Sequence, residues 1–556
     1  MFYTRIFDII PETASVEENN REDNLSWEMK TVGEAFDTAF YLSLYSDVAS
    51  HKDVDPLEHY CVWGWKERRD PSPGFSTGFY LDNNPDIQEV GINPFCHYLV
   101  SGKAEGRLAS HPAGQDFEVL RNMLPLEEDV SRSKKCTRYK KIAETKLEQE
   151  DLHNLITDRL TENKVLFVAI THDNYLVSLG GVQLCISKEQ LIANQNNQTY
   201  LAFFPIKSLP RLLHPEDTLD PEVGIILDGE VLGACKWSAA TATARSLRLQ
   251  GAEHRLVIHQ LLGHDPRRIV DFADASGSRN CVLWLHDYIS LCPSFTLQRN
   301  RLRFCGAPAP SSNACTLCVF GEERLSQIDT IQSLFECLNV HVVSPSEVAL
   351  EIWRASGLLK ESSSRVIPHI TLEDVNHSAS KERLGPIKVA FVGTIAPHKG
   401  WPTFLNLVQT FNRENDFEFY YFGQGDAQNS KIKTVNAQVT GHDSNAMVNA
   451  LRKEEIDVVI HWAASPETFS ISTFEAFSGG ACVITNFGSG NVARAVQDVG
   501  LGKVFESEKQ MFDCFTNGEL RKIVANLRSV RARTTLEPRW SSLTLDASDV
   551  WTQETP

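Results

Sequence analysis

The chain has 556 residues, too many for one hydrophobic core, so about three domains are expected. Its formal net charge of −18 disfavours nucleic acid as a partner, because phosphate binding needs a basic surface. No stretch approaches the roughly 18 apolar residues of a membrane span, and the acidic start MFYTRIFDIIPETASVEENNRED lacks the apolar centre of a signal peptide. Thirteen cysteines at irregular spacing indicate reduced thiols. We therefore expect a multi-domain cytoplasmic protein.

Residues 1–110 are predicted to form a small, mainly α-helical domain with an internal repeat. Segments 36–74 and 75–108 align with each other at a constant spacing, apart from a one-residue deletion in the second copy. The matched pairs are Phe40/Phe79, Tyr41/Tyr80, Leu42/Leu81, Asp47/Asp86, Pro56/Pro94, His59/His97, Tyr60/Tyr98, Gly64/Gly102, Glu67/Glu105 and Arg69/Arg107. Each copy is too small to bury its aromatic face alone, so we expect the two copies to stack on each other or on a neighbour, with these residues in the core. A role in oligomerisation or in holding a polysaccharide chain is the alternative.

Residues 111–163 are polar and are predicted to form a helical linker. The segment SRSKKCTRYKK at 131–141 carries six basic residues. It is either a solvated helix face or a basic patch that contacts a membrane surface.

From Lys164 onward, short β-branched-rich runs alternate with helix-like stretches, which is typical of buried parallel strands in an α/β fold. The runs of the first series are VLFVAI (165–170), RLVIHQLLG (255–263), CVLWLHDY (281–288) and VHVVSP (340–345). Those of the second are IKVAFVGTI (387–395), FEFYYFGQG (417–425), VVIHWAA (458–464) and ACVIT (481–485). We predict Rossmann-like domains at 164–370 and 386–505, then C-terminal helices at 506–556 that cross back to the first. The segment at 366–386 is interpreted as the connection between the domains. Ligands of such sheets bind at the carboxyl ends of the strands.

Two features of the first series suggest a site at those strand ends. Gly180 and Gly181 precede a predicted helix, where the backbone can approach a ligand, although a plain turn is the alternative. His286 and Asp287 end a strand and are predicted to point into the cleft, whereas His259, in a weaker context, is interpreted as structural.

Four cysteines lie close together in the first series: Cys292, Cys305, Cys315 and Cys318. The segment ends in Cys-x-x-Cys within a loop rich in Gly, Pro and Ser, which suits tetrahedral zinc. Twelve residues separate the first two cysteines, so reduced thiols or a disulfide stay open beside a structural metal site. The arginines of the same loop, Arg299, Arg301 and Arg303, suit an anionic acceptor.

In the second series, Gly393 and Thr394 follow a strand, and Lys399 precedes Gly400 at a predicted helix start. A lysine here can reach a diphosphate, but the spacing is not that of a P-loop ATPase.

The stretch SPETFSISTFEAFSGGACVIT at 465–485 places Glu467 and Glu475 eight positions apart. We predict a helix start near Ser470, so that the unpaired N–H groups of Ser470, Ile471 and Ser472 face an anion. Glu467 then lies in the loop above the ligand and Glu475 lies deeper along the helix. A local capping box, Ser472-x-x-Glu475, explains the second carboxylate but not the first.

These residues together resemble the retaining glycosyltransferases of family GT4. In the second series the resemblance rests on PETFSISTFEAFSGGACVIT, FVGTIAPHKG and YFGQG, and in the first series on GGVQ and WLHDY. It covers roughly residues 164–535. The resemblance implies a GT-B fold, in which an N-terminal acceptor domain and a C-terminal nucleotide-sugar donor domain face each other across a cleft. The N-terminal repeat resembles modules attached to bacterial polysaccharide glycosyltransferases.

The resemblance also implies a role for each residue. Glu467 faces the donor sugar, Glu475 holds the ribose hydroxyls, and the amides at 470–472 bind the diphosphate with Lys399. His286 contacts the 6-hydroxyl region of the sugar, and Gly181 lies against the diphosphate or acceptor. Two positions depart from the family pattern: Thr394 stands where arginine is frequent, and Ser470 stands where glycine is usual.

The function implied is metal-independent, retaining transfer of a sugar from a UDP- or GDP-sugar to a glycan or lipid-linked glycan acceptor. The product would be bacterial O-antigen (lipopolysaccharide), capsule or exopolysaccharide. The implied location is the cytoplasm, with peripheral contact at the inner face of the plasma membrane, and the repeats would mediate homo-oligomers or bind a partner glycosyltransferase. The alternatives are a GT-B-like epimerase or phosphorylase, and a non-catalytic scaffold that binds nucleotide sugars.

Overall fold

The computed structural model describes residues 19–111, 145–376, 385–411 and 416–551, apart from 52, 73, 179, 208, 426, 428, 438, 441–442 and 532–533. The chain divides into two compact units, one of residues 1–123 with 426–432 and one of residues 124–425 with 433–556. The predicted basic run at 131–141 and most of the predicted helical linker lie outside the described residues. Among the described residues, no helix has the length and apolar character needed to cross a membrane.

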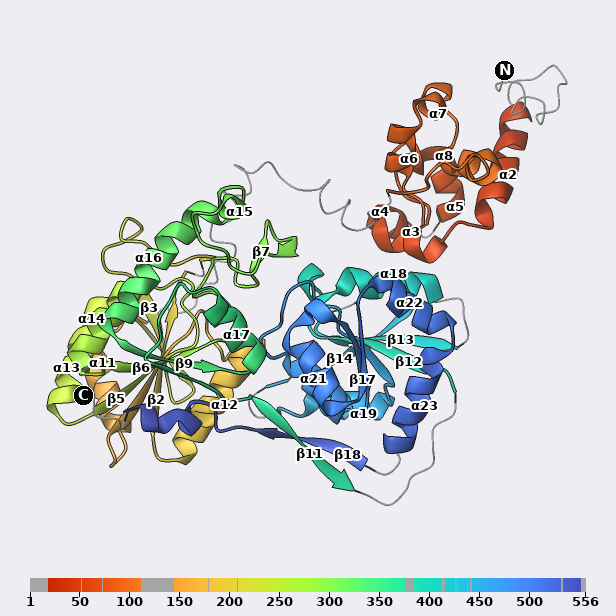
Figure 1. Ribbon diagram of the computed structural model, residues 1–556. Coiled ribbons are helices and arrows are strands. Elements are labelled where there is room, and N and C mark those ends of the chain that lie inside the picture. Colours follow the sequence, from red (N-terminus) through yellow and green to blue (C-terminus); the bar gives the residue numbers. More distant parts are fainter. Residues whose placement is uncertain are drawn as a thin grey trace. The chain divides into compact units, whose positions relative to one another are not determined.

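Short helices build the N-terminal unit (Figure 1). In chain order they are α2 (Asn19–Gly33), α3 (Thr38–Leu44), α4 (Ser46–Ala49), α5 (Pro56–His59), the π-helical turn η1 (Tyr60–Gly64), α6 (Thr77–Asn83), α7 (Pro85–Val90), α8 (Pro94–His97) and the π-helical turn η2 (Tyr98–Gly102). Each repeat therefore ends in an α-helix that widens into a π-turn. Aromatic side chains of both copies share one buried core, in which the rings of Tyr60 and Phe95 lie 6.4 Å apart.

The matched residues of the repeat make the same contacts twice. The triads are Tyr41–His59–Gly64 and Tyr80–His97–Gly102. The tyrosine hydroxyl lies 3.0 Å from the histidine Nδ1 in the first copy and 2.8 Å in the second. A Cβ on either glycine would lie 2.1 Å from that hydroxyl, so any other residue would displace the tyrosine side chain. The sequence repeat therefore marks a repeated buried contact.

The repeated arginines also have equivalent partners. Arg69 pairs with both carboxylate oxygens of Asp47 at 3.0 and 2.7 Å. Arg107 pairs with those of Asp86 at 3.0 and 2.9 Å. Each pair joins the end of its copy to the second helix of the same copy.

The first α/β domain is built on an eight-stranded sheet in the order β10-β9-β6-β5-β1-β2-β3-β4. Its strands are β1 (Val165–Ile170), β2 (Thr199–Pro205), β3 (Glu222–Leu227), β4 (Glu230–Lys236), β5 (Glu253–Ile258), β6 (Asn280–Trp284), β9 (Asn339–Ser344) and β10 (Ser363–Val366). Its helices are α11 (Gln149–Arg159), α12 (Gly181–Gln195), α13 (Trp237–Leu249), α14 (Pro266–Ser276), α16 (Gly321–Cys337) and α17 (Glu347–Ala355). Pairing is parallel except along β2-β3-β4, where an Asp228-Gly229 turn joins an antiparallel hairpin.

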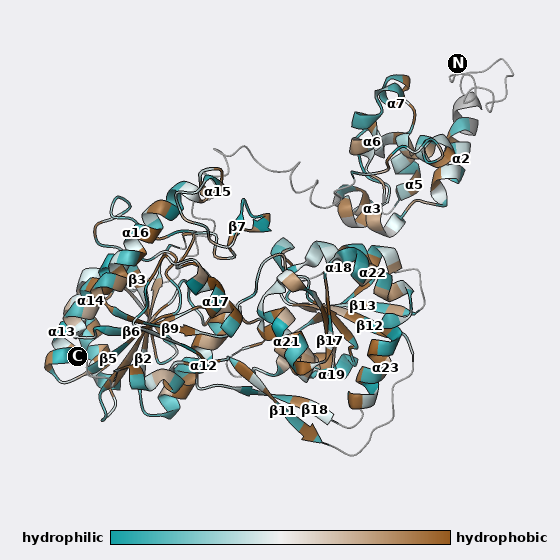
Figure 2. Ribbon diagram, viewed as in Figure 1, coloured by the Kyte–Doolittle hydropathy of each residue, from teal (hydrophilic) through white to brown (hydrophobic). Residues whose placement is uncertain are grey.

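The second α/β domain has a six-stranded sheet in the order β14-β13-β12-β15-β16-β17. Its strands are β12 (Ile387–Val392), β13 (Phe417–Gly423), β14 (Ile432–Asn436), β15 (Val458–Ile460), β16 (Cys482–Asn486) and β17 (Gly502–Phe505). Its helices are η3 (Pro397–Lys399), α18 (Trp401–Phe411), α19 (Ala446–Glu454), α20 (Ile471–Ser478), η4 (Phe487–Ser489), α21 (Asn491–Val499), α22 (Glu508–Thr516) and α23 (Glu519–Arg531). Figure 2 shows that the apolar residues of this domain, as of the first, gather along the central strands.

The segments that link the two α/β domains differ from the prediction. The connection at 366–386 contains a strand, β11 (Ile370–Asn376), and the region 506–556 contains β18 (Thr534–Trp540) and the 3₁₀ segment η5 (Leu543–Trp551) as well as helices. β11 and β18 pair antiparallel in a two-stranded ribbon, visible in Figure 1. Each strand pairs with a strand from a distant part of the chain, and the composition of a short segment does not reveal such a partner. η5 packs against the first sheet, where Trp284 Nε1 donates to Thr544 Oγ1 at 2.7 Å.

The predicted fold class is confirmed: a small helical repeat domain is followed by two Rossmann-like α/β domains, the GT-B arrangement.

The repeated Tyr–His–Gly contact predicts an effect of Gly102→Ala. The added methyl group must displace the Tyr80 hydroxyl from His97, so the opening free energy of the N-terminal unit should fall by about 1–3 kcal/mol. Hydrogen exchange of the full-length protein, read on peptides from residues 75–111, measures this change. Gly74→Ala is the matched control, because a Cβ at Gly74 meets no atom within 4 Å. Equal protection in the two variants would contradict the prediction.

Candidate functional site

A cavity of about 680 Å³ is lined by both α/β domains. Such a volume is typical of small-molecule sites. All ten residues predicted for catalysis and donor binding line it: Gly181, His286, Gly393, Thr394, Lys399, Glu467, Ser470, Ile471, Ser472 and Glu475. The fold thus brings together residues from parts of the chain that lie far apart in sequence.

The start of α20 forms one wall of the cavity. The helix begins at Ile471, and Ser470 before it has φ 69° and ψ 81°, the left-handed conformation that favours glycine. No side chain caps this helix start, so its first N–H groups are left for a ligand. The Ser470 hydroxyl instead lies 2.9 Å from the Thr473 hydroxyl. The serine therefore keeps the backbone path that glycine would take, at a conformational cost of about 1 kcal/mol.

Lys399 and Glu467 form an ion pair at the same wall. Lys399 Nζ donates to both carboxylate oxygens of Glu467, at 2.7 and 2.8 Å. The Glu467 side chain is 13% exposed and that of Lys399 34%. Burial opposes the charge on Glu467, but the Lys399 ammonium holds the pKa of this carboxyl below its ordinary value. The cation predicted for a diphosphate is thus already paired with the predicted catalytic carboxylate.

A glycine allows the Glu467 loop to approach its neighbour. Gly490, at φ 65°, pairs with Glu467 as an isolated bridge, and a Cβ on it would lie 2.7–2.8 Å from backbone atoms of Pro466 and Glu467. Only glycine permits both this conformation and this contact. The position of the carboxylate is therefore fixed by a backbone interaction as well as by Lys399.

Glu475 lies just over one turn into α20, and its side chain lines the same cavity. The residue is 6% exposed, and among the described residues no donor bonds its carboxyl group. Burial raises the pKa of Glu475 to about 8. A buried carboxyl group without a partner is costly for a fold, and it suits a ligand that brings hydroxyl donors.

A chain of hydrogen bonds runs from His286 into the core of the first domain. His286 Nε2 lies 3.0 Å from His259 Nδ1, and His259 Nε2 lies 3.0 Å from Glu189 Oε1. Glu189 is fully buried and also accepts hydrogen bonds from the Tyr200 hydroxyl and from the backbone N–H and hydroxyl of Thr544. Burial opposes its charge, yet His259 and these donors hold the pKa of Glu189 below its ordinary value.

This chain fixes the orientation of the His286 ring. Because a carboxylate only accepts, Nε2–H of His259 donates to Glu189, and the other ring nitrogen, Nδ1, shares a hydrogen bond with His286 Nε2. Burial, with His369 and His259 nearby, holds the pKa of His286 well below its ordinary value, so this ring is neutral. The ring also lines the cavity, where it can form a hydrogen bond with a ligand hydroxyl. His259 was interpreted from sequence as structural, whereas the structure links it directly to the site.

Several residues of the cavity were not predicted. His369, from the connection between the domains, stacks on His286 with ring centroids 5.2 Å apart. His461 directly follows β15. A histidine at the carboxyl end of a buried strand is the pattern that predicted His286, and the same pattern would have predicted His461. Thr468 joins the two domains, because its hydroxyl donates to the His286 carbonyl at 2.7 Å and its carbonyl accepts from Ser346 at 2.6 Å.

Asp287 does not line the cavity, contrary to the prediction that it points into the cleft with His286. Its carboxylate accepts from the Ile289 N–H at 2.9 Å and from the Gln260 side chain. Burial raises the pKa of Asp287 to about 7. The Asp287 side chain therefore points away from the cavity that His286 lines. The WLHDY motif does not show which of the two side chains faces the cleft.

Two groups in the described residues bear on metal binding. Cys185, His286 and His369 bring three ligand atoms within 4.8 Å of one another beside the cavity. The two imidazole rings are stacked at 29°, and nitrogen lone pairs lie in the ring planes, so they do not converge on one ion. The four predicted cysteines line a separate, small cavity together with Arg299, while Arg301 lies over the Phe320 ring at 5.6 Å.

The shifted pKa of Glu475 predicts a pH-dependent stability. The folded protein keeps the proton on this group up to about pH 8, whereas the unfolded chain releases it near the ordinary glutamate pKa of 4.5. Stability from this group is therefore present below pH 4.5 and is lost as pH rises towards 8, by an amount on the order of a few kcal/mol. Glu475→Gln should remove this loss, so the thermal midpoint of the variant should increasingly exceed that of the wild type between pH 5 and 8. A constant difference across this range would contradict the prediction.

No protein-family model matches the chain, and no curated protein matches it. Among solved structures, sucrose-phosphate synthase from Thermosynechococcus elongatus is 13% identical over 70% of this chain and 98% of that one, with a TM-score of 0.40. Anabaena HepE in complex with UDP-glucose has the same values. The pneumococcal O-GlcNAc transferase GtfA in complex with UDP and GlcNAc is 10% identical over 66% of this chain and 96% of that one, with a TM-score of 0.42.

Proposed function

We propose that this chain is a retaining glycosyltransferase that moves a sugar from a UDP- or GDP-sugar to a glycan or lipid-linked glycan in bacterial surface polysaccharide synthesis. The observation that carries the proposal is one cavity in which a lysine, an uncapped helix start, two carboxyl groups in different environments and a neutral histidine converge from two Rossmann-like domains. A nucleotide sugar has a complementary group for each of them.

The diphosphate would lie between Lys399 and the start of α20. The helix supplies N–H donors and the positive end of its dipole, and the lysine supplies a full charge. Because Lys399 bonds both oxygens of Glu467, an incoming phosphate competes with this carboxylate for the ammonium. Donor binding would thereby release Glu467 toward the sugar.

Glu475 would hold the ribose. Vicinal hydroxyl groups donate to a carboxylate, and these bonds favour its charged form. The group that is protonated at neutral pH without ligand would therefore lose its proton when the nucleotide binds.

His286 and Glu467 would act on the sugar. The His286 ring forms a hydrogen bond with a sugar hydroxyl, and Glu467 stabilises positive charge that develops on the sugar ring. The bond from the anomeric carbon to the phosphate oxygen breaks and a bond to the acceptor oxygen forms on the same face. The acceptor proton passes to the departing diphosphate, so the products are the glycoside and a nucleoside diphosphate.

Glu467→Gln separates binding from transfer. The variant keeps the shape of the side chain but removes the negative charge, so kcat should fall about 100-fold or more, while affinity for the nucleoside diphosphate is kept or increased because Lys399 is released. Transfer is measured with a panel of nucleotide sugars and lipid-linked glycans, and affinity by calorimetry. Glu150→Gln, an exposed change on α11, is the control.

Full transfer by Glu467→Gln would overturn the proposal. An epimerase would change the donor sugar without any acceptor, and a scaffold would bind nucleotide sugar without turnover in any arm of the panel.

A further inference from the structure

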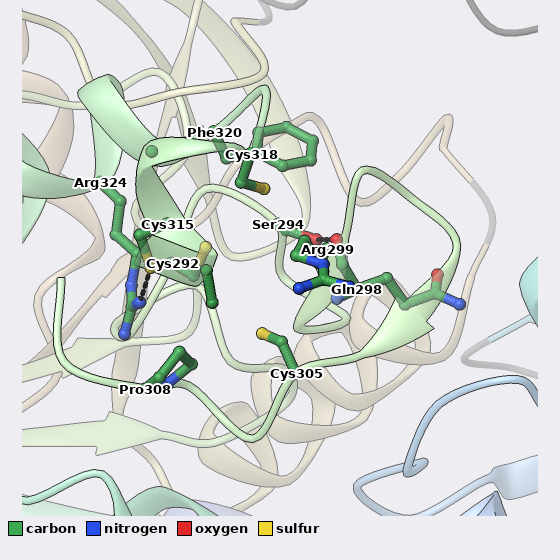
Figure 3. A pocket seen from close by; sticks show the side chains of 12 residues that line it. Cys292, Ser294, Gln298, Arg299, Cys305, Pro308, Cys315, Cys318, Phe320 and Arg324 are labelled. Carbon is green, nitrogen blue, oxygen red and sulfur yellow. Dashed lines mark hydrogen bonds between the residues drawn. The ribbon is translucent and has the colours of Figure 1, made fainter. Parts of the chain in front are cut away.

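The four cysteines of the first domain surround a single small cavity, which shares no lining residue with the cavity of the proposed transfer site. Cys292 follows β6 by eight residues, Cys305 follows β8 (Arg303–Phe304), and Cys315 and Cys318 lie in and just after α15 (Asn313–Thr316). Figure 3 shows their side chains around the same space, with Cys305 facing the other three. The cavity measures about 20 Å³, which suits a single ion better than an organic ligand.

The segment that carries these cysteines has little regular structure. Between Leu285 and Phe320 it contains two-residue strands, β7 (Gln298–Arg299) and β8, and the four-residue helix α15. Loops of this length need an additional constraint. Four of its residues other than glycine hold positive φ, between 48° and 60°: Leu297, Asn300, Arg301 and Ala307. Such conformations persist only where the surroundings fix them.

A buried arginine beside the sulfur atoms needs negative charge. Arg324 is 2% exposed, and its Nη1 donates to Cys315 Sγ at 2.8 Å. Its Nε donates to the Leu291 carbonyl, while Nη2 has no hydrogen-bond partner among the described residues. In that same part of the chain, no carboxylate pairs with Arg324. A guanidinium buried among neutral thiols is unfavourable, whereas thiolates would compensate its charge and accept its N–H groups.

We propose that Cys292, Cys305, Cys315 and Cys318 bind one zinc ion as a structural tetrathiolate site. Binding releases four protons from the thiols, gives a Zn(Cys)₄ group of net charge 2−, and places this charge against Arg324. No three of the four sulfurs lie within 4.8 Å of one another, whereas ligands at a Zn–S distance of about 2.3 Å lie about 3.8 Å apart. The loop therefore closes on the ion by a shift of its irregular backbone. The site holds this loop in place independently of any sugar transfer.

Elemental analysis of the full-length protein tests the proposal. The chain purified from zinc-containing medium should carry one zinc per molecule, and Cys305→Ser/Cys318→Ser should carry at least about ten-fold less. Cys337→Ser, an exposed cysteine at the end of α16, is the matched control and should keep the metal.

A second measurement does not depend on the fold of a variant. Chelator-treated wild-type protein should bind one cobalt(II) ion and show the visible bands of a tetrahedral tetrathiolate, and zinc should displace it. A wild-type chain without zinc, a double variant that keeps it, an iron cluster in its place, or a Cys–Cys disulfide found by mass spectrometry would each overturn the proposal.

Discussion

The ion pair between Lys399 and Glu467 is the interaction on which the rest of the cleft depends. It places a carboxylate beside the uncapped start of α20, where a helix dipole would favour any anion, and it keeps that carboxylate charged although it is largely buried. Under the proposed function, a phosphate group would fit the same place better than the carboxylate, because it would bond the helix N–H groups as well as the lysine. Glu467 would then be an internal substitute for the phosphate, and the donor would displace it from Lys399.

The opposite wall is organised from the other end of the chain. Thr544, in η5, supplies two hydrogen bonds to Glu189, which orients His259 and through it His286. The ribbon of β11 and β18 brings η5 back to the first domain. The C-terminal segment therefore helps to position a residue of the cleft without lining the cleft itself. A substitution of Thr544 would change the orientation of the His286 ring.

The sequence predicted the parts of the site that lie within one local segment. Glu467, Ser470 and Glu475 share a loop and a helix, so spacing alone indicates their arrangement. The short β-branched-rich runs likewise predict most parallel strands, but they do not include the antiparallel hairpin at Asp228-Gly229. The chain of hydrogen bonds from Glu189 to His286 could not be predicted in the same way. His259 and Thr544 lie 70 and 355 residues from Glu189 along the chain, and nothing in the local sequence of either residue indicates a site. Nor could a sequence pattern show that Lys399 is already paired.

Calorimetric titration with a nucleoside diphosphate and with its parent nucleoside, for the wild type and for Lys399→Met, tests the central role of this lysine most directly. The exposed Lys453→Met serves as control. At fixed ionic strength, the loss of the phosphate-binding cation should weaken the diphosphate about 10–100-fold and leave the nucleoside within about two-fold of the wild type. An unchanged affinity for the diphosphate, or an equal loss for both ligands, would contradict the account.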